Sequence, residues 1–239
     1  MAWYREWFGE EYLGLYAHRD AEEAAAHVDF VARVLGEARP RAVLDLACGT
    51  GRHTAPLVAR GVRACGVDLS LTLLGFGRGL PRVRGDMRRL PFAGGTFDWV
   101  LNFFTSFGYF ESERENLQVL EEVARVLAPG GALVLDLFNI DRVLAELRER
   151  ETVTSPGRRI EIERSFDAAS RRLLKRMRVE LAGRPPRTFV ESVRAYREEE
   201  VAAALAGAGL AVAARFGDFT GERFHRDSER LIFVARRPA

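Results

Sequence analysis

The fold of this chain is decided by residues 43–51, which read VLDLACGTG. An apolar run predicts a strand over residues 42–47, and a helix is expected over 52–60, directly after the turn. Gly49 and Gly51 have no Cβ, so the backbone can turn sharply there and approach a ligand closely. The first N–H groups of the following helix can bind an anionic part of that ligand. The stretch therefore predicts a strand, a glycine turn and a helix that together bind a small molecule.

Two features of this turn argue against a nicotinamide dinucleotide site. The fingerprint of such sites is Gly-x-Gly-x-x-Gly, and this chain has no third glycine at the required offset. An acidic residue, Asp45, also precedes the turn, which is unusual in a nicotinamide site. The turn is therefore expected to bind a different ligand.

Short apolar strands and helices alternate along the chain after this turn. The expected strands are residues 42–47, 62–67, 82–85, 97–103 and 132–138, and the expected helices are residues 52–60, 70–78 and 112–127. Ser112 and Glu115 resemble a capping box at the start of the last of these helices. Buried strands separated by helices predict a parallel sheet that is covered on both faces.

After about residue 150 the pattern changes to that of antiparallel hairpins. Apolar and charged residues alternate, and turns are expected at residues 167–170 and 183–186. A helix over 198–208 and strands over 210–216 and 231–235 complete the chain. The predicted fold class is α/β: a Rossmann-like, seven-stranded, mostly parallel sheet with an antiparallel β insertion, a lid, after strand five.

The whole chain, residues 1–239, is expected to form one domain with two additions. N-terminal cap helices are expected over residues 1–37, because aromatic residues recur every four positions up to Tyr16 and Asp20 resembles a helix N-cap. The second addition is the lid, expected over residues 151–197.

The composition limits the kinds of partner. The chain has 36 basic and 34 acidic residues, a formal net charge of +2, which argues against a dedicated nucleic-acid binder. Lys175 is the only lysine. Residues 151–197 hold 12 basic and 6 acidic residues, so the expected lid carries +6. Such a lid either attracts an acidic or phosphorylated substrate or is a solvated sheet face.

The sequence also predicts where the protein works. No segment approaches about 18 consecutive apolar residues, so no membrane span is expected. The N-terminus lacks the basic region and apolar stretch of a secretory signal. Cys48 and Cys65 have no CxxC spacing and are expected as small core residues that form neither a disulfide framework nor a zinc site. The expected location is the cytoplasm.

Residues 45–51 resemble motif I of the class I S-adenosylmethionine-dependent methyltransferases. Further motifs of that family follow in the same order and read GVDLS, GDM, LPF, FD and RVLAPGG, at residues 66–70, 85–87, 90–92, 97–98 and 125–131. Ala47 stands where many members have glycine, and alanine also occurs there. The resemblance implies S-adenosyl-L-methionine as the cofactor, S-adenosyl-L-homocysteine as its product, and no metal.

The resemblance also implies contacts to the cofactor. Asp68 ends the second strand and is expected to accept both ribose hydroxyls. Asp86 is expected to face the adenine amino group, and the backbone of Met87 to contact the ring. Tyr16, with Arg19 as its companion, is expected to reach the methionine carboxylate. The expected cofactor-binding residues are Tyr16, Asp45, Ala47, Gly49, Gly51, Asp68, Leu69, Asp86, Met87 and Asn102.

Residues 102–110, which read NFFTSFGYF, narrow the resemblance. They follow the fourth strand, where open α/β sheets bind ligands. They resemble a small-molecule subgroup that includes amino-sugar N,N-dimethyltransferases and is related to glycine N-methyltransferases. The expected substrate contacts are Ser106, Tyr109, Arg194 and Tyr196, of which the last two fit a solvated face equally well. The catalytic residue is not assigned, and the candidates are Tyr109 and His225.

For four further residues the sequence predicts only an approximate position. Arg52 and His53 follow the glycine turn and either contact the methionine carboxylate or face solvent. His18 and His27 are expected at the surface.

Methyl transfer from a sulfonium is an in-line displacement of a good leaving group, so positioning can supply most of the acceleration. A base is needed only if the acceptor arrives protonated. The leading hypothesis is an enzyme that methylates nitrogen or oxygen of a small molecule as a monomer or homodimer. The alternatives are an RNA or protein methyltransferase with the same core and a non-catalytic cofactor-binding regulatory module.

Overall fold

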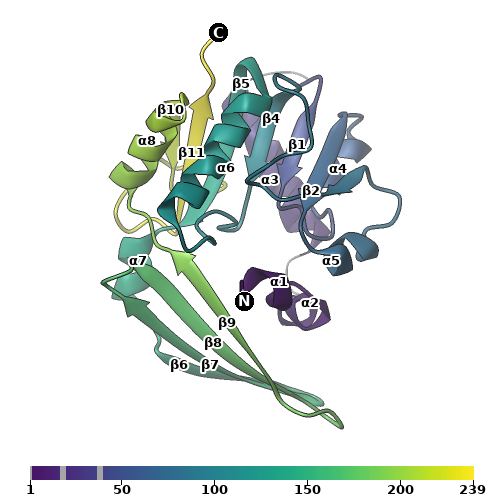
Figure 1. The fold of residues 1–239 in the computed structure, drawn as a ribbon, viewed down its shortest axis with the longest axis vertical. Helices are drawn as coiled ribbons and strands as arrows, with labels where there is room; N and C mark the ends of the chain where they lie inside the picture. Colours follow the sequence, from purple (N-terminus) through teal and green to yellow (C-terminus); the bar gives the residue numbers. More distant parts are fainter. Residues whose placement is uncertain (1, 17–19, 37–39) are drawn as a thin grey trace.

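The computed structural model describes residues 2–16, 20–36 and 40–239. Its larger sheet has seven strands in the order β10-β11-β5-β4-β1-β2-β3 (Figure 1). These strands are β1 (Val43–Leu46), β2 (Ala64–Asp68), β3 (Arg82–Arg84), β4 (Phe97–Asn102), β5 (Leu127–Phe138), β10 (Ala211–Phe216) and β11 (Arg230–Arg236). Strands β1 to β5 run parallel, and β11 pairs antiparallel with both β5 and β10. The predicted seven-stranded, mostly parallel sheet is confirmed.

Helices cover both faces of this sheet. They are α3 (Ala21–Leu35), α4 (Thr54–Ala59), α5 (Leu71–Phe76), α6 (Glu113–Val126) and α8 (Glu198–Gly207), whereas the short helix α7 (Ile140–Ala145) follows β5 and leads into the insertion. Successive residues of a strand point to opposite faces, so Leu133 and Leu135 pack in one buried cluster with Val123 of α6. Val134 between them packs in a second buried cluster with Val31 of α3. Burial on both sides is what a parallel sheet requires.

Local capping chemistry explains the start of α3 but not the start of α6. The Asp20 carboxylate accepts the N–H of Glu23 at 2.9 Å, as a helix N-cap does. The capping box expected at Ser112 is absent, because its side chain makes no cap hydrogen bond. Glu115 pairs with Arg88 instead. A charge-assisted bond is stronger than a bond to a neutral N–H, which favours this alternative.

The insertion after β5 forms a separate antiparallel sheet in the order β6-β7-β8-β9, here called the lid sheet. Its strands are β6 (Arg150–Ser155), β7 (Arg158–Asp167), β8 (Arg172–Leu181) and β9 (Arg187–Arg194). One face of it carries Ile160, Met177 and Phe189, which pack in a cluster with Trp7. Figure 1 shows the helices α1 (Tyr4–Trp7) and α2 (Glu10–Leu15) between the lid sheet and the larger sheet.

The aromatic N-terminus forms two short helices, whereas its four-residue repeat predicts continuous helical spacing. The break falls at Phe8 and Gly9, where Gly9 adopts an extended backbone (φ −133°, ψ −156°). Trp7, which is 1% exposed, enters the core of the lid sheet. Phe8 stacks instead on Tyr109, with ring centroids 5.7 Å apart. Packing against two different partners therefore overrides the local repeat.

Candidate active site

A cavity of about 1230 Å³, partly open to solvent, lies at the carboxyl ends of β1 to β4. Open α/β sheets bind ligands at this edge. The segments that follow β1, β2, β3 and β4 supply most of its lining, and α1 and α2 supply the rest. Among the predicted site residues, those that line it are Tyr16, Asp45, Ala47, Gly49, Asp68, Leu69, Asp86, Met87, Ser106 and Tyr109.

The turn after β1 forms one wall of the cavity. Ala47 and Gly49 have left-handed backbones, with φ of 60° and 56°. Glycine adopts this conformation freely, whereas for alanine it is uncommon and strained. The N–H of Cys48 between them donates to the carbonyl of Val67 at 3.0 Å. The turn is therefore held against β2 in a conformation of the kind that clusters at functional sites.

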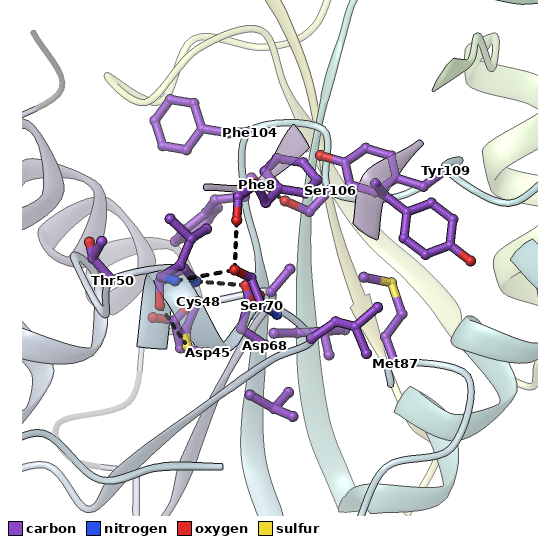
Figure 2. A pocket seen from close by; sticks show the side chains of 18 of the residues that line it. Phe8, Asp45, Cys48, Thr50, Asp68, Ser70, Met87, Phe104, Ser106 and Tyr109 are labelled. Atoms are coloured by element: carbon purple, nitrogen blue, oxygen red, sulfur yellow. Dashed lines mark hydrogen bonds between the residues drawn. The ribbon is translucent and has the colours of Figure 1, made fainter. Parts of the chain in front are cut away.

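Asp68 at the end of β2 completes this wall (Figure 2). Its carboxylate accepts the N–H of Gly49 and the N–H of Ser70, each at 2.8 Å. Burial raises the pKa of Asp68, and these backbone hydrogen bonds oppose the rise. The Ser70 hydroxyl donates to the carbonyl of Phe8 at 2.6 Å. One carboxylate thus connects the glycine turn, the start of α5 and, through Ser70, the N-terminal cap.

Asp45 is a second buried carboxylate, 3% exposed, at the end of β1. Thr54 donates its hydroxyl to this carboxylate at 2.7 Å. Burial raises the pKa of Asp45 to about 6, and the nearby charge of Asp68 acts in the same direction. A negative charge here is therefore costly until a cationic group is bound beside it.

Asp45→Asn is expected to stabilise the ligand-free protein near neutral pH. The unfolded carboxyl titrates near pH 4 and the folded one near pH 6, so the folded protein holds this proton more tightly. Ionisation therefore lowers stability as the pH rises from about 4 to about 6, and the full cost remains above that range. Urea unfolding should show the variant more stable by about 1–3 kcal/mol at pH 8 and equally stable at pH 4. A difference independent of pH would contradict this prediction.

Asp86 at the end of β3 lines the cavity but already has a charged partner. Its carboxylate accepts hydrogen bonds from the guanidinium of Arg88, one of them at 2.6 Å, and Arg88 also pairs with Glu115. These bonds hold the pKa of Asp86 below its usual range against the opposing effect of burial. The carboxylate is therefore ionised and fixed in direction.

The segment after β4 is strained and is held by residues that the sequence analysis missed. Phe104 and Thr105 both have φ of 56°. The Asp136 carboxylate accepts the N–H of Phe104 at 2.7 Å, and the carbonyl of Asp136 accepts the N–H of Thr105 at 3.0 Å. Arg230 donates two hydrogen bonds to the same carboxylate, at 2.7 and 2.8 Å. The available signal was an aspartate inside the apolar run ALVLDLF at residues 132–138, since an unpaired charge is rarely buried.

An aromatic wall faces the strand ends across the cavity. We use this name for Phe8, Tyr12, Tyr16 and Tyr109, whose side chains line it. Phe8 contacts the rings of both Tyr12 and Tyr109, and Tyr12 contacts Tyr16. Ser106 lines the cavity beside this wall and donates its hydroxyl to the carbonyl of Phe103 at 2.8 Å. Burial raises the pKa of Tyr109 well above its usual range, so this phenol stays protonated.

Tyr16 lines the cavity from α2, and the single lysine of the chain holds its hydroxyl group. The Lys175 ammonium donates to the Tyr16 hydroxyl at 2.7 Å and lies 3.6 Å from Glu191. The expected companion of Tyr16, Arg19, and the expected surface residue His18 lie outside the described residues.

His27 is buried, so its expected surface position is wrong. It is 6% exposed, and its Nδ1 lies 3.2 Å from Nε2 of His53. Burial lowers the pKa of His27 to about 4. The missed signal is its place on the inward face of α3, three residues after Ala24 and one before Val28. His53 and Arg52 both line the cavity.

The structure places five predicted site residues outside the cavity lining. Gly51 (φ 86°) completes the turn against Leu80, and Asn102 donates its side-chain amide to the carbonyl of Leu46 at 3.1 Å. Arg194 pairs with Glu113 and Glu200, and the Tyr196 hydroxyl donates to Glu113. His225 is exposed in the connector between β10 and β11. Glu113 at the start of α6 and Glu200 in α8 thus bind Arg194 and Tyr196 outside the cavity lining.

Among residues 2–16, 20–36 and 40–239, no three His, Cys, Asp or Glu side chains are grouped as metal ligands. Within the same ranges, every helix is too short or too polar to cross a membrane.

Comparison with known proteins agrees with this geometry. Residues 43–131 match a family model described as a methyltransferase domain. A cypemycin N-terminal methyltransferase from a Streptomyces species is 30% identical over 213 residues, which cover 82% of this chain and 83% of that protein.

Two solved structures are each 26% identical to this chain. One is CalS10 with bound S-adenosylmethionine, an amino pentose methyltransferase from Micromonospora echinaspora (TM-score 0.71, covering 95% of this chain and 97% of that one). The other is the sugar N-methyltransferase KedS8 from a Streptoalloteichus species (TM-score 0.72, covering 97% and 94%).

The fold, the glycine turn with its acidic strand ends, and these relatives define the class of protein. The chain belongs to the class I S-adenosylmethionine-dependent methyltransferases and is an enzyme of that family. The family resemblance carried by motif I is thereby confirmed.

Proposed function

We propose that the protein transfers a methyl group from S-adenosylmethionine to an amine nitrogen of a small molecule. The observation that carries this proposal is a single cavity with carboxylates at the strand ends and an aromatic wall opposite them. The two parts differ in the chemistry that they bind, so we assign the first to the cofactor and the second to the methyl acceptor. The exception is Tyr16, whose hydroxyl we assign to the methionine carboxylate of the cofactor.

The carboxylate end fits the cofactor. Asp45, Asp68 and Asp86 line it, and the cofactor carries a sulfonium and an ammonium group, so opposite charges meet. In this proposal Asp68 accepts the ribose hydroxyls, and Asp86 and Met87 hold the adenine. Ala47, Gly49 and Leu69 complete the contacts of this end. Bound S-adenosylmethionine supplies a methyl group on a sulfonium, which needs no further activation.

The aromatic wall favours an amine as the acceptor. Aromatic faces attract cations and apolar groups. The relatives are named for methylation at an N-terminus, of an amino pentose and of a sugar nitrogen. No described residue of the lid sheet lines the cavity. Many lid arginines, such as Arg164 and Arg178, pair with glutamates. The basic lid therefore lends no support to an acidic acceptor. The aromatic wall and the relatives together favour nitrogen over oxygen as the methylated atom.

In this proposal the chain acts mainly by positioning. The Tyr109 phenol, with its raised pKa, remains a hydrogen-bonding group and does not act as a phenolate base. Ser106 and Tyr109 orient the amine, and holding the two reactants in line can supply up to about 7–11 kcal/mol. The acceptor amine gives its proton to solvent before transfer, because only the neutral nitrogen has a lone pair for the displacement. We further propose that the reaction uses no metal, and that the enzyme is a cytoplasmic monomer or homodimer.

The test is tritium transfer from methyl-labelled S-adenosylmethionine. The purified protein is offered D-glucosamine, benzylamine and glycine, and separately total RNA and a protein extract. Label in one of the amines is expected, together with its loss in the Asp68→Ala variant. Label confined to RNA or protein would overturn the proposal, and binding of S-adenosylhomocysteine with no transfer to any fraction would favour a regulatory module.

A further inference from the structure

Arg172 is a buried cation at the start of β8 whose partners are neutral. The residue is 9% exposed. Among the described residues, no carboxylate lies within 4.0 Å of its guanidinium, since it forms none of the ion pairs found there. Burial lowers the pKa of Arg172. An unpaired buried charge is costly, so its hydrogen bonds have to compensate.

The guanidinium donates to one short segment, residues 108–110, which follows β4. It donates to the carbonyls of Gly108 at 3.3 Å, Tyr109 at 3.2 Å and Phe110 at 2.9 Å. On the neighbouring strand β9, Nε donates to the Ser192 hydroxyl at 2.7 Å, and Nη2, which also serves Gly108 and Tyr109, donates to the Ser192 carbonyl. Three successive carbonyls of the segment after β4 are therefore held by one side chain of the lid sheet.

The planar fork of arginine suits this task. Five N–H donors in fixed directions reach several acceptors at once, whereas lysine offers a compact ammonium on a flexible stem. The backbone contact is also close, because the N–H of Arg194 donates to the carbonyl of Gly108 at 2.8 Å. A Cβ on Gly108, whose φ is 91°, would lie 2.9 Å from the carbonyl oxygen of Arg194.

The same segment is held from the side of the larger sheet by α6. The Asn116 side chain accepts the N–H of Phe110 and donates to its carbonyl, each at 3.2 Å. The carbonyl of Phe110 thus receives hydrogen bonds from both Asn116 and Arg172. Tyr109, between these anchors, projects its ring into the aromatic wall.

We propose that Arg172 is a positioning residue for the methyl acceptor, acting from the lid sheet through the backbone of residues 108–110 to set the place of the Tyr109 side chain. The lid sheet thereby shapes the acceptor end of the cavity without contributing a side chain to its lining. This inference rests on the proposed function only in assigning the end of the cavity lined by the aromatic wall to an amine. The placement of Tyr109 by Arg172 stands independently of the acceptor.

The first experiment measures the placement of Tyr109 and needs no acceptor. The chain has five tyrosines, so protein labelled with 3-fluorotyrosine has few ¹⁹F resonances, and Tyr109→Phe assigns the relevant one. In Arg172→Gln the Tyr109 resonance should shift or broaden while that of Tyr16 stays in place. Arg172→Lys should give a smaller change. The matched control is Arg176→Gln on the same strand, where the side chain is exposed.

The second experiment separates acceptor from cofactor. With whichever of D-glucosamine, benzylamine and glycine is methylated, Arg172→Gln should lower kcat/KM for the amine at least tenfold. Its affinity for S-adenosylhomocysteine should change less than twofold. Ser192→Ala, which removes one partner of the guanidinium, should give a smaller loss in the same direction.

The outcomes are distinct. An unchanged Tyr109 resonance in Arg172→Gln would overturn the inference. A loss of S-adenosylhomocysteine affinity as large as the loss of kcat/KM for the amine, with all five tyrosine resonances displaced, would also overturn it, because it would indicate a purely structural role. A shifted Tyr109 resonance with no amine methylated by any form of the protein would support the positioning role and contradict the proposed acceptor class.

Discussion

Asp68→Ala is expected to abolish the rise in melting temperature that S-adenosylhomocysteine produces in the unsubstituted protein. A ligand that binds only the folded state at 100 times its Kd stabilises it by about 2.7 kcal/mol. The Asp68 carboxylate accepts the N–H groups of Gly49 and Ser70. The substitution removes both the proposed acceptor for the ribose hydroxyls and the connection that holds the glycine turn. We expect affinity to fall at least about 100-fold, which corresponds to about 2.7 kcal/mol.

Two variants separate binding from folding in this experiment. Asp68→Asn keeps the shape and one acceptor oxygen, so it should retain an intermediate shift. Asp29→Ala removes an exposed carboxylate on α3 that pairs only with Arg60 at 2.8 Å, and it should behave as the unsubstituted protein. A full melting shift in Asp68→Ala would exclude Asp68 from cofactor binding. A shift with NAD in place of S-adenosylhomocysteine would contradict the cofactor assignment.

Asp136→Ala is expected to cause the largest loss of stability among the changes considered. The Asp136 side chain is fully buried and meets Arg230, whose side chain is 19% exposed, in a two-bond ion pair. Removing one member of such a pair leaves the other charge buried without a partner and lowers the free energy of unfolding by about 3–5 kcal/mol. The N–H of Phe104 also loses its acceptor. Urea unfolding without ligand measures the loss, and a change below about 1 kcal/mol would contradict the prediction.

A double-mutant cycle of Asp136→Leu and Arg230→Met, made singly and together, tests the cause. If the unpaired charge dominates, the double variant Asp136→Leu/Arg230→Met should recover much of the stability lost by either single change. The strained backbone at Phe104 and Thr105 would still lack its carboxylate acceptor. We therefore expect the double variant to fold well yet to bind S-adenosylhomocysteine more weakly, because Phe104 lines the cavity. Additive losses would indicate that the ion pair contributes little.

Much of the carboxylate end of the cavity could be predicted from sequence because it is local. Each expected contact follows directly from the end of a strand, and parallel strands end at the same edge of the sheet. Asp45, Asp68 and Asp86 consequently lie around one cavity although 41 positions separate the first from the last. Local rules also gave the Asp20 cap of α3. They did not predict the pairing of Glu115 with Arg88, because that partner comes from another element.

The end of the cavity that we assign to the acceptor was less predictable because its residues are brought together by packing between distant segments. Arg194 and Tyr196 share a stretch of chain that the sequence assigned to the lid, and their partners Glu113 and Glu200 hold them away from the cavity. Arg172 meets the carbonyls of residues 108–110, more than sixty positions away. A side chain can donate to any backbone carbonyl, so no residue pattern predicts a hydrogen bond to a carbonyl that lies so far away along the chain.

By itself the sequence determined the class of enzyme, the parallel sheet and the acidic residues at the strand ends, because hydrophobic alternation, glycine turns and acidic strand ends lie within short segments. The tertiary structure alone decided that the lid sheet carries the N-terminal aromatic helices on its apolar face, that His27 is buried, and that Asp136 and Arg172 hold the segment after β4. The physical reason is that burying apolar surface and satisfying buried polar groups depend on which segments meet, and that is a property of the whole chain.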